Sequence, residues 1–453
     1  MSSPDLIVVG DCNPDLVISG NDVTPEFGQR EKLVGAMALM IGGSAAITAV
    51  AAARLGLRVA LVAAVGDDPA GELMLALLAR EQVDVSPVLV RRGSPTGMTA
   101  VLSAGSDRAI LTSLGAMASL TADDVPRSLL AGARHLHVSS YFLLEDSLGP
   151  GLGDLLAVAR RHGASTSLDP NYDPAERWGD ERLRAALGQV DFFLPNETEA
   201  LGISGHRDVG PAAAALAELG GSVAIKLGAR GALCCPAAGG RRAGGEQPGQ
   251  VLVSVPPVEP VDTTGAGDCF NAGLIAGLLD GLDLPRAVAV GCAVGAACTS
   301  AAGGTGAVVD RAAACQLSAR ATFALDPAAL RGDASGLEQA VRLQAFLEIG
   351  DLPADGGQRR AEPACGRLAA EPRREHGEQN LVGRRQAGQG VQGEWFLKRR
   401  AQIPVTLEDP GDHPGEDRIA GQHRGPAPPA QRCPSLRARA GPSADDRRLA
   451  AVR

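Results

Sequence analysis

The stretch IGGSAAITAVAAARLGLRVALVAAVGDDPAG, residues 41–71, places a helix and a strand in immediate succession. Two glycines at its start precede a run of small residues that have helical spacing, and this run ends at Gly56. The segment at 58–66 is apolar throughout after Arg58, which is typical of a strand buried on both faces of a parallel sheet. Asp67 and Asp68 follow, and we expect them to cap the next helix.

The same alternation continues on both sides of this stretch, to about residue 310. Strands are predicted at 6–10, 58–66, 135–140, 165–169, 191–195 and 222–228. Helical spacing is found at 44–55, 70–80, 150–162 and 211–219. Strands that alternate with helices predict an α/β domain with a doubly wound, mainly parallel central sheet and helices on both faces.

Two segments, at about 12–40 and 90–115, interrupt this rhythm. The second contains alternating residues on both sides of a turn at 104–107, as a hairpin does. We therefore predict a small antiparallel β lid outside the main sheet. The domain is predicted to span residues 1–312, and the remainder, 313–453, to be a low-complexity, disordered C-terminal extension rich in Gly, Pro, Gln and Arg. An out-of-frame origin of this extension is a further hypothesis.

Composition and charge limit the class of protein. The chain has a net charge of −9, and acidic residues outnumber basic ones in the first 310 residues, which disfavours nucleic acid as a partner. The nine cysteines contain no CxxC pair, a usage typical of reduced thiols. No apolar run approaches the length of a membrane span, and no signal peptide is evident at the N-terminus. These features predict a cytoplasmic protein without a membrane partner.

The segment VDTTGAGDCFNAGLIAGLL at 261–279 combines glycines and an acid at the start of an apolar run. A helix is predicted to begin near Ala266, with Thr264 as its cap. The glycines allow backbone N–H groups at the helix N-terminus to point at an anion. Asp268 lies in the first turn, where it either favours the helix dipole alone or takes a proton beside a transferring phosphoryl group.

Together with four other motifs, these two stretches resemble the signature motifs of the PfkB/ribokinase family of carbohydrate kinases. The other motifs, in the family's order, are Asn13-Pro14-Asp15, Asp169-Pro170-Asn171, Asn196-Glu197-Thr198-Glu199 and Lys226-Leu227-Gly228-Ala229-Arg230-Gly231. The resemblance covers about residues 5–310 and is specific for the family rather than for one substrate. It implies a ribokinase-like fold and phosphoryl transfer from ATP with Mg²⁺.

The resemblance also implies roles for individual residues. Asp268 matches the family's catalytic base, and the family's anion hole is matched by Gly265, Ala266 and Gly267. The positions that match its ATP-binding residues are Asn196, Lys226, Gly228, Gly231 and Thr264. Glu199 matches a residue that holds Mg²⁺ through water, and Asp262 belongs to a loop that binds a monovalent cation such as K⁺ through backbone carbonyls.

On the acceptor side, the positions that match sugar-binding residues are Asn13, Asp15, Gly42, Gly43 and Asp169. Carboxylate and amide side chains suit a polyol because each can bind two hydroxyl groups. The start of the helix after the two glycines departs from ribokinases, which have a lysine and a sugar-binding asparagine there. Ser44 and Ile47 stand at these positions, so we expect an acceptor other than ribose.

Structural interpretations of the same residues stay open at this point. Asn13 and Asp15 fit a turn after the first strand, and Asn196 with Glu199 fits a helix cap. Lys226 could serve the fold alone. Asp169 could belong to an Asp-Pro turn, although ligands of open α/β sheets bind at the carboxyl ends of strands.

We therefore predict an ATP-dependent kinase that phosphorylates a hydroxymethyl group of a sugar. A nucleoside kinase of the same family is the nearer alternative, and a non-catalytic sugar- or nucleotide-binding regulator is the second. The predicted partners are the sugar and ATP, together with a second copy of the chain bound through the lid.

Overall fold

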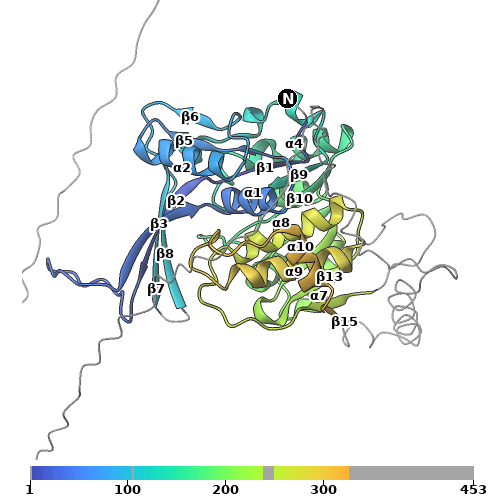
Figure 1. Ribbon diagram of the computed structural model, residues 1–453. Coiled ribbons are helices and arrows are strands. Elements are labelled where there is room, and N and C mark those ends of the chain that lie inside the picture. Colours follow the sequence, from blue (N-terminus) through green and yellow to red (C-terminus); the bar gives the residue numbers. More distant parts are fainter. Residues whose placement is uncertain (1–2, 105–106, 238–248, 326–453) are drawn as a thin grey trace, which may run out of the picture. The chain divides into compact units, whose positions relative to one another are not determined.

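A nine-stranded sheet forms the centre of the described part of the chain (Figure 1). The computed structural model describes residues 3–104, 107–237 and 249–325. From one edge to the other, the strands are β15 (Thr322–Leu325), β14 (Val251–Ser254), β13 (Ala232–Cys235), β12 (Ser222–Lys226), β11 (Phe192–Phe193), β10 (Ser165–Leu168), β9 (His135–Val138), β1 (Leu6–Val9) and β4 (Val59–Val62).

The pairing confirms a mainly parallel sheet. From β4 through β1, β9, β10 and β11 to β12, every neighbouring pair is parallel, while β13, β14 and β15 add an antiparallel edge. In register, Leu6 of β1 lies opposite Val59 on one side and His135 on the other. The first strand thus lies inside the sheet, as the doubly wound prediction requires.

Helices cover both faces of this sheet. Successive side chains of a strand point to opposite faces, so an apolar strand needs a cover on each face. In β1, Leu6 and Val8 join one apolar cluster, and Ile7 and Val9 join the other. The first cluster contains residues of α1 (Ser44–Arg54), α2 (Pro69–Arg80), α8 (Ala266–Leu279), α9 (Leu284–Cys298) and α10 (Arg311–Ser318). The second contains residues of α3 (Arg127–Leu130), α4 (Gly149–Arg161), α5 (Glu181–Leu187), α6 (Glu197–Ser204) and α7 (Val209–Ala217). Short 3-10 helices are formed by Gly115–Ser119, Ala122–Asp124 and Gly228–Arg230.

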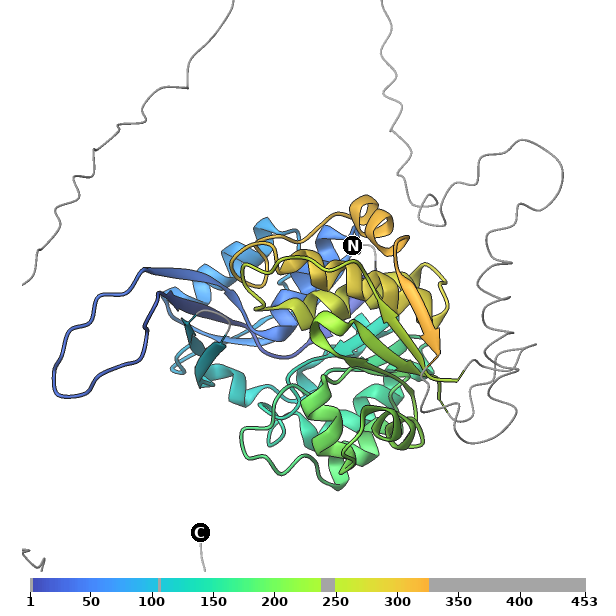
Figure 2. The same cartoon turned by 90° about the horizontal axis from the view of Figure 1, so that it is seen from below.

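The lid is a separate four-stranded sheet, built from the two segments in which it was predicted. Its strands, in spatial order, are β3 (Ala36–Gly42), β2 (Asn13–Ser19), β7 (Met98–Ala104) and β8 (Asp107–Ser113). They project to one side of the central sheet in Figure 1, and in Figure 2 the loop of residues 20–35 extends beyond them. A two-stranded sheet of β5 (Ala64–Gly66) and β6 (Leu89–Arg91) lies apart from both.

Two predicted boundaries are wrong. The apolar run at 58–66 is not one strand, because β4 pairs in the central sheet while β5 turns away to pair with β6. The predicted domain end at 312 falls within α10, and β15 then pairs with β14 and packs Phe323 and Leu325 against the core. The rest of the predicted extension, residues 326–453, lies outside the described residues. Among the helices that are described, none is long and apolar enough to cross a membrane.

Candidate active site

A cavity of about 1300 Å³ collects most of the predicted site residues. It is lined by residues that follow β1, β10 and β11, by the end of β12, by lid strands and by the start of α8. The predicted residues that line it are Asn13, Asp15, Gly43, Asp169, Asn196, Glu199, Lys226, Gly228, Gly231, Thr264, Gly265, Ala266, Gly267 and Asp268. Gly42 and Asp262 are not among the lining residues. Residues more than 250 positions apart thus meet at the carboxyl ends of parallel strands, where open α/β sheets bind ligands.

The start of α8 is free of a side-chain cap. Its N-cap residue is Gly265, in the left-handed region with φ of 73°, and no side chain accepts from the first-turn N–H groups. Thr264 was expected to be the cap, and this prediction is wrong. Its hydroxyl instead donates to Asp262 Oδ1 at 2.7 Å, and Asp262 also accepts the backbone N–H groups of Thr264 and Gly303. The Ala266 N–H donates to the carbonyl of Thr263 at 3.3 Å, and the other N–H groups of such an uncapped helix start suit an anion.

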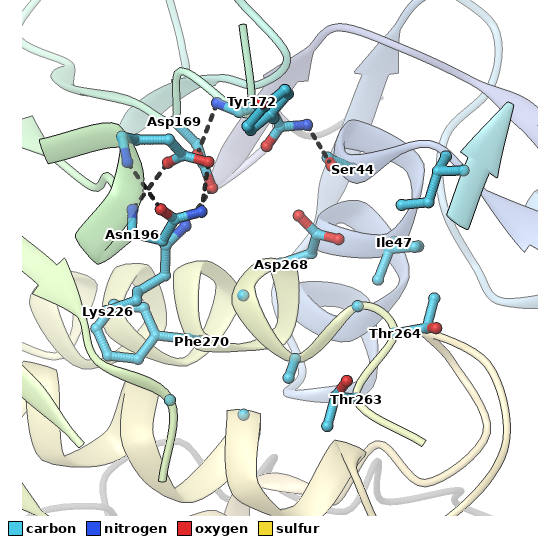
Figure 3. Close-up of a pocket in the computed structure, with 18 of the residues that line it drawn as sticks. Ser44, Ile47, Asp169, Tyr172, Asn196, Lys226, Thr263, Thr264, Asp268 and Phe270 are labelled. Carbon is cyan, nitrogen blue, oxygen red and sulfur yellow. Dashed lines mark hydrogen bonds and ion pairs between the residues drawn. The ribbon is translucent and has the colours of Figure 1, made fainter. Parts of the chain in front are cut away.

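Asp268 lies in the first turn of α8, and its carboxylate is directed into the cavity (Figure 3). The side chain is hydrogen-bonded to Ser44, whose hydroxyl also accepts Asn171 Nδ2 at 2.7 Å. The residue is only 9% exposed. Burial, together with the charge of Asp169, raises the pKa of Asp268 well above its ordinary value. A carboxyl in such surroundings is suited to accept a proton from a hydroxyl group.

Lys226 and Asp169 form a buried ion pair beside Asp268. Lys226 Nζ donates to Asp169 Oδ2 at 2.5 Å, and Asn271 Nδ2 donates to the same oxygen at 2.5 Å. Burial alone would lower the pKa of Lys226, but the charges of Asp169 and Glu199 outweigh it and raise the pKa. The lysine therefore stays charged and supplies a fixed cation to the cavity.

Asn196 and Glu199 form a capping box at the start of α6. Asn196 Oδ1 accepts the Glu199 N–H at 3.0 Å, and Glu199 Oε2 accepts the Asn196 N–H at 2.8 Å. The helix-cap interpretation is thus confirmed, yet both residues also line the cavity. Burial and the charge of Asp169 raise the pKa of Glu199 to about 7.

These oxygen donors fit Mg²⁺ bound through water. Within the described ranges, no group of three or more His, Cys, Asp or Glu side chains could hold a metal ion by itself. Both oxygens of Glu199 already accept hydrogen bonds from Asn196. Magnesium ions in proteins commonly keep several waters and bind through one or two carboxylates and substrate phosphates, which matches this arrangement.

The acceptor side is built by the lid strand β2. Asn13 Nδ2 donates to Asp15 Oδ1 at 2.9 Å and to Thr99 Oγ1 at 3.0 Å, and Thr99 in turn contacts Thr112 at 3.1 Å. The turn interpretation of Asn13 and Asp15 is therefore wrong, because both residues belong to a strand. Gly42 serves Asp15 rather than a ligand, since a Cβ atom at residue 42 would lie 1.9 Å from Asp15 Oδ1.

Several residues of the cavity were given no site role from the sequence. Asp11 caps α1 by accepting the N–H groups of Ser44 and Ala45 at 3.0 and 2.9 Å. Asn171, at φ of 56°, and Tyr172 both line the cavity. Arg108 of β8 donates to the hydroxyls of Thr263 and Thr264 at 3.3 Å. Asn271 does not line the cavity but donates to Asp169, and it carried a readable signal because it follows Asp268 by three residues and so shares its helix face.

Comparison with known proteins identifies the family of this chain. The sequence profile described as pfkB family carbohydrate kinase matches residues 3–311. Ribokinase from Haemophilus influenzae is 31% identical over 302 residues, which cover 64% of this chain and 90% of that protein. The 2-dehydro-3-deoxygluconokinase of Bacillus subtilis is 31% identical over 270 residues, covering 56% of this chain and 79% of the relative.

Solved structures share the fold. The PfkB protein from Polaromonas sp. JS666 superposes with a TM-score of 0.56 at 26% identity, covering 66% of this chain and 96% of that one. Adenosine kinase from Sinorhizobium meliloti gives a TM-score of 0.61 at 23% identity, covering 70% and 99% respectively, and supports the fold alone. The ribokinase-like α/β fold predicted from the sequence is confirmed.

Proposed function

Because the chain belongs to the PfkB family of carbohydrate kinases, we propose that it transfers the γ-phosphoryl group of ATP to a hydroxymethyl group of a sugar. One observation carries the proposal. The Asp268 carboxylate lies at the uncapped N-terminus of α8 and in the same cavity as the hydroxyl-binding side chains of Asn13 and Asp15.

In the proposed reaction, Asp268 takes the proton of the acceptor hydroxyl. The hydroxyl oxygen forms a bond to the γ-phosphorus of ATP, the bond between that phosphorus and its bridging oxygen breaks, and ADP leaves. The backbone N–H groups of Gly265, Ala266 and Gly267 neutralise charge on the phosphoryl oxygens. Preorganised donors of this kind typically contribute about 3 kcal/mol each.

The nucleotide side of the proposal uses Lys226, Asn196, Gly228 and Gly231. Lys226 supplies a fixed positive charge for the phosphates, and the glycines let the chain pass close to them. Bound Mg²⁺ would neutralise phosphate charge, and Glu199 with Asn196 would hold it through water.

The K⁺ site near Asp262 stays a prediction. The Asp262 carboxylate accepts hydrogen bonds from the N–H groups of residues 264 and 303. These bonds bring the backbone of two loops together behind the anion hole, which supports a site formed by backbone carbonyls.

A nucleoside acceptor remains the second candidate, because Tyr172 adds an aromatic side chain to the cavity beside Phe142. Phe142 and Tyr172 both line it, and Tyr172 is 48% exposed. A half-exposed ring could pack on a base as well as on the apolar face of a sugar. A non-catalytic regulator is disfavoured by the presence of both Asp268 and the uncapped α8 N-terminus.

We also propose that two copies associate through the lid. Most of the exposed large hydrophobic side chains of the described residues belong to the lid or its loop, namely Phe27, Leu33, Met37, Leu39, Met98, Ile110 and Leu111. Exposed apolar side chains that gather on one small sheet and its loop favour an interface. Sedimentation should show a dimer that the double variant Met37→Thr, Leu111→Thr weakens and that Val90→Thr, outside the lid, leaves unchanged. A wild-type monomer at all concentrations contradicts the proposal.

The kinase function is tested by measuring ADP formation from ATP and Mg²⁺ across a panel of sugars and nucleosides. We expect acceptor-dependent ADP release and a phosphate monoester visible by ³¹P NMR. The Asp268→Asn variant should lose this activity, while Asp154→Asn, an exposed residue on α4, should retain it. Acceptor-independent ATP hydrolysis alone, or an active Asp268→Asn variant, contradicts the proposal.

A further inference from the structure

Buried carboxylates dominate the acceptor side of the cavity. Asp11, Asp15 and Asp268 line it and are each at least nine-tenths buried. Glu145 and Asp146 line it at more exposed positions. Asp173 lines it too, but its carboxylate accepts three backbone N–H groups of its own turn. Any acceptor therefore enters a region lined by acidic side chains, in which an added negative charge would be unfavourable.

The basic side chains that line the cavity, among the described residues, are Lys226 and Arg108. Lys226 is paired with Asp169. Arg108 donates to the hydroxyl groups of the anion-hole loop and helps to lower the pKa of Asp262 behind it. Arg177, which forms an ion pair with Glu145, balances that one carboxylate. In contrast, the contacts of Asp15 are the neutral side chains of Asn13 and Thr99.

The polarity of the hydrogen bonds points the same way. The side-chain N–H groups of Asn13 already donate hydrogen bonds to Asp15, to Thr99 and to the carbonyl of Pro14. The carboxylates on the acceptor side of the cavity accept hydrogen bonds and, in their ionised form, donate none. A hydroxyl group of the acceptor can donate to them, whereas a carboxylate or phosphate of the acceptor offers only further acceptors.

Even without a ligand, neighbouring carboxylates disfavour one another's ionised form. Burial and the charge of Asp11 raise the pKa of Asp15 to about 7. The pKa of Asp268 is raised by burial and by Asp169, with a smaller contribution from Asp11. A further negative charge in this low-dielectric region would be repelled more strongly than in water.

We infer that the acceptor is an uncharged polyol, a free sugar or a nucleoside, and that sugar acids and sugar phosphates are rejected by the carboxylates around Asp15. The inference rests on the proposed kinase function and names its substrate class. The apolar side chains of Ile47, Val101 and Phe142, which line the same cavity, are compatible with the C–H faces of a neutral ring. Relatives named for an acidic sugar and for ribose are both present in the family, so membership alone leaves the charge of the acceptor open.

The inference is tested with pairs of acceptors that differ in charge. Suitable pairs are D-fructose with D-fructose 6-phosphate, D-glucose with D-gluconate, and D-ribose with D-ribonate. We expect kcat/KM to be higher for the uncharged member by about tenfold or more, because one added like charge in a partly buried site costs at least the free energy that corresponds to a tenfold change. Equal or higher kcat/KM for the charged members overturns the inference.

A charge-reversal variant tests the electrostatic cause. Asp146→Lys places a cation at the exposed side of the cavity, while Asp154→Lys makes the same change on the surface of α4, away from it. The ratio of kcat/KM for uncharged over charged acceptors should fall about threefold or more in Asp146→Lys, and most at low salt. It should stay at the wild-type value in Asp154→Lys. Equal ratios in both variants overturn the electrostatic explanation.

A binding measurement separates this inference from the kinase proposal. Calorimetry or thermal shift with the same pairs, without ATP, reports acceptor binding alone. Preferential binding of uncharged members by a protein that never turns over ATP would contradict the kinase proposal and leave the inference standing. Turnover without preference, or binding without preference, would overturn the inference and leave the kinase proposal intact.

Discussion

At the residue scale, the burial that suits Asp268 for catalysis also costs stability. Its pKa in the folded protein lies well above its ordinary value. A carboxyl with a raised folded-state pKa contributes stability below its unfolded pKa and loses that contribution as the pH rises through the folded value. At neutral and alkaline pH, therefore, the ionised form of Asp268 destabilises the fold.

The Asp268→Asn variant should show both effects together. We expect turnover to fall by about 100- to 10,000-fold, since that is the range for general-base catalysis. We expect Tm at pH 8 to rise by about 1–2 °C, which corresponds to about 1 kcal/mol for a domain of this size. Steady-state kinetics and thermal unfolding measure the two effects, with Asp154→Asn as control. A fall in both turnover and Tm would indicate a structural role instead.

The wild-type enzyme should lose activity on the acid side of its pH profile. A base must be deprotonated to act, and the raised pKa of Asp268 moves its titration upward from the usual range of aspartate. We therefore expect log kcat/KM to rise with pH at values above the usual aspartate pKa of about 4. A profile that is flat from pH 4.5 to pH 8, in a range where the protein stays folded, would contradict this assignment.

Two buried histidines depend on pH in the opposite sense. His135 and His137 lie in a chain of hydrogen bonds with Ser165, Ser167 and Ser139, with distances between 2.6 and 2.9 Å. Burial lowers the pKa of His135 to about 3 and that of His137 to about 4. A depressed pKa contributes stability above the unfolded value of about 6.5, and this contribution is lost as the pH falls toward the folded value.

Replacing these histidines should therefore reduce the acid sensitivity of the fold. Each histidine contributes up to about 1.4 kcal/mol of stability loss per pH unit between pH 6.5 and pH 4.5. In His135→Gln, His137→Gln, the free energy of unfolding should be lower at pH 7 but change less on acidification than in the wild type. Urea unfolding at pH 7 and at pH 4.5 measures the free energy of unfolding of both proteins. Comparing the double variant with the wild type at each pH cancels the opposing effect of the site carboxyls, because both proteins contain them. Parallel pH dependences would contradict the assignment.

At the scale of the element, the start of α8 depends on two glycines for different reasons. Gly265 has φ of 73°, and a Cβ atom there would lie 2.4 Å from Gly304 Cα. Gly267 is helical, and its Cβ atom would lie 3.5 Å from Lys226 Nζ, an ordinary contact. The first glycine shapes the loop, whereas the second keeps the space beside the lysine open.

The two alanine variants should separate these roles. Gly265→Ala should lower the free energy of unfolding by roughly 1–3 kcal/mol through backbone strain and displacement of Gly304, and should lose activity as well. Gly267→Ala should keep or raise Tm, because alanine favours helix over glycine by up to about 1 kcal/mol. Its KM for ATP should nevertheless increase, since the added methyl group lies beside Lys226. Equal Tm values for the two variants would contradict this explanation.

At the scale of the whole molecule, the described fold closes at β15 rather than at the predicted boundary. Its pairing covers the edge of β14, and Ala321, Phe323 and Leu325 add to the core. The match to the family profile ends at residue 311, before this strand. The strand β15 of the central sheet therefore lies beyond the residues that match the family profile.

Truncation should show how much of the chain the kinase fold needs. We expect a chain that ends after residue 330 to retain the Tm and activity of the full chain. A chain that ends after residue 312 removes β15 and most of α10, and should unfold at a Tm lower by several degrees. Thermal unfolding and ADP release compare the three proteins. Full stability of the shorter chain would show that β15 is dispensable.

Local pattern determined much of this protein. Short strand-like runs predicted β1, β9, β10 and β12, and helical spacing predicted α1, α2, α4 and α7, because each signal depends only on neighbouring residues. Glycines beside an acid identified α8 and Asp268 for the same reason. Tertiary structure alone decided that Asp262 also accepts the N–H of Gly303, and that the run at 58–66 divides between two sheets. It also decided that Asp11 and Asp15, more than 250 residues before Asp268 in the chain, share one cavity with it. Such outcomes depend on which segments the sheet order brings together, and a local pattern carries no record of that order.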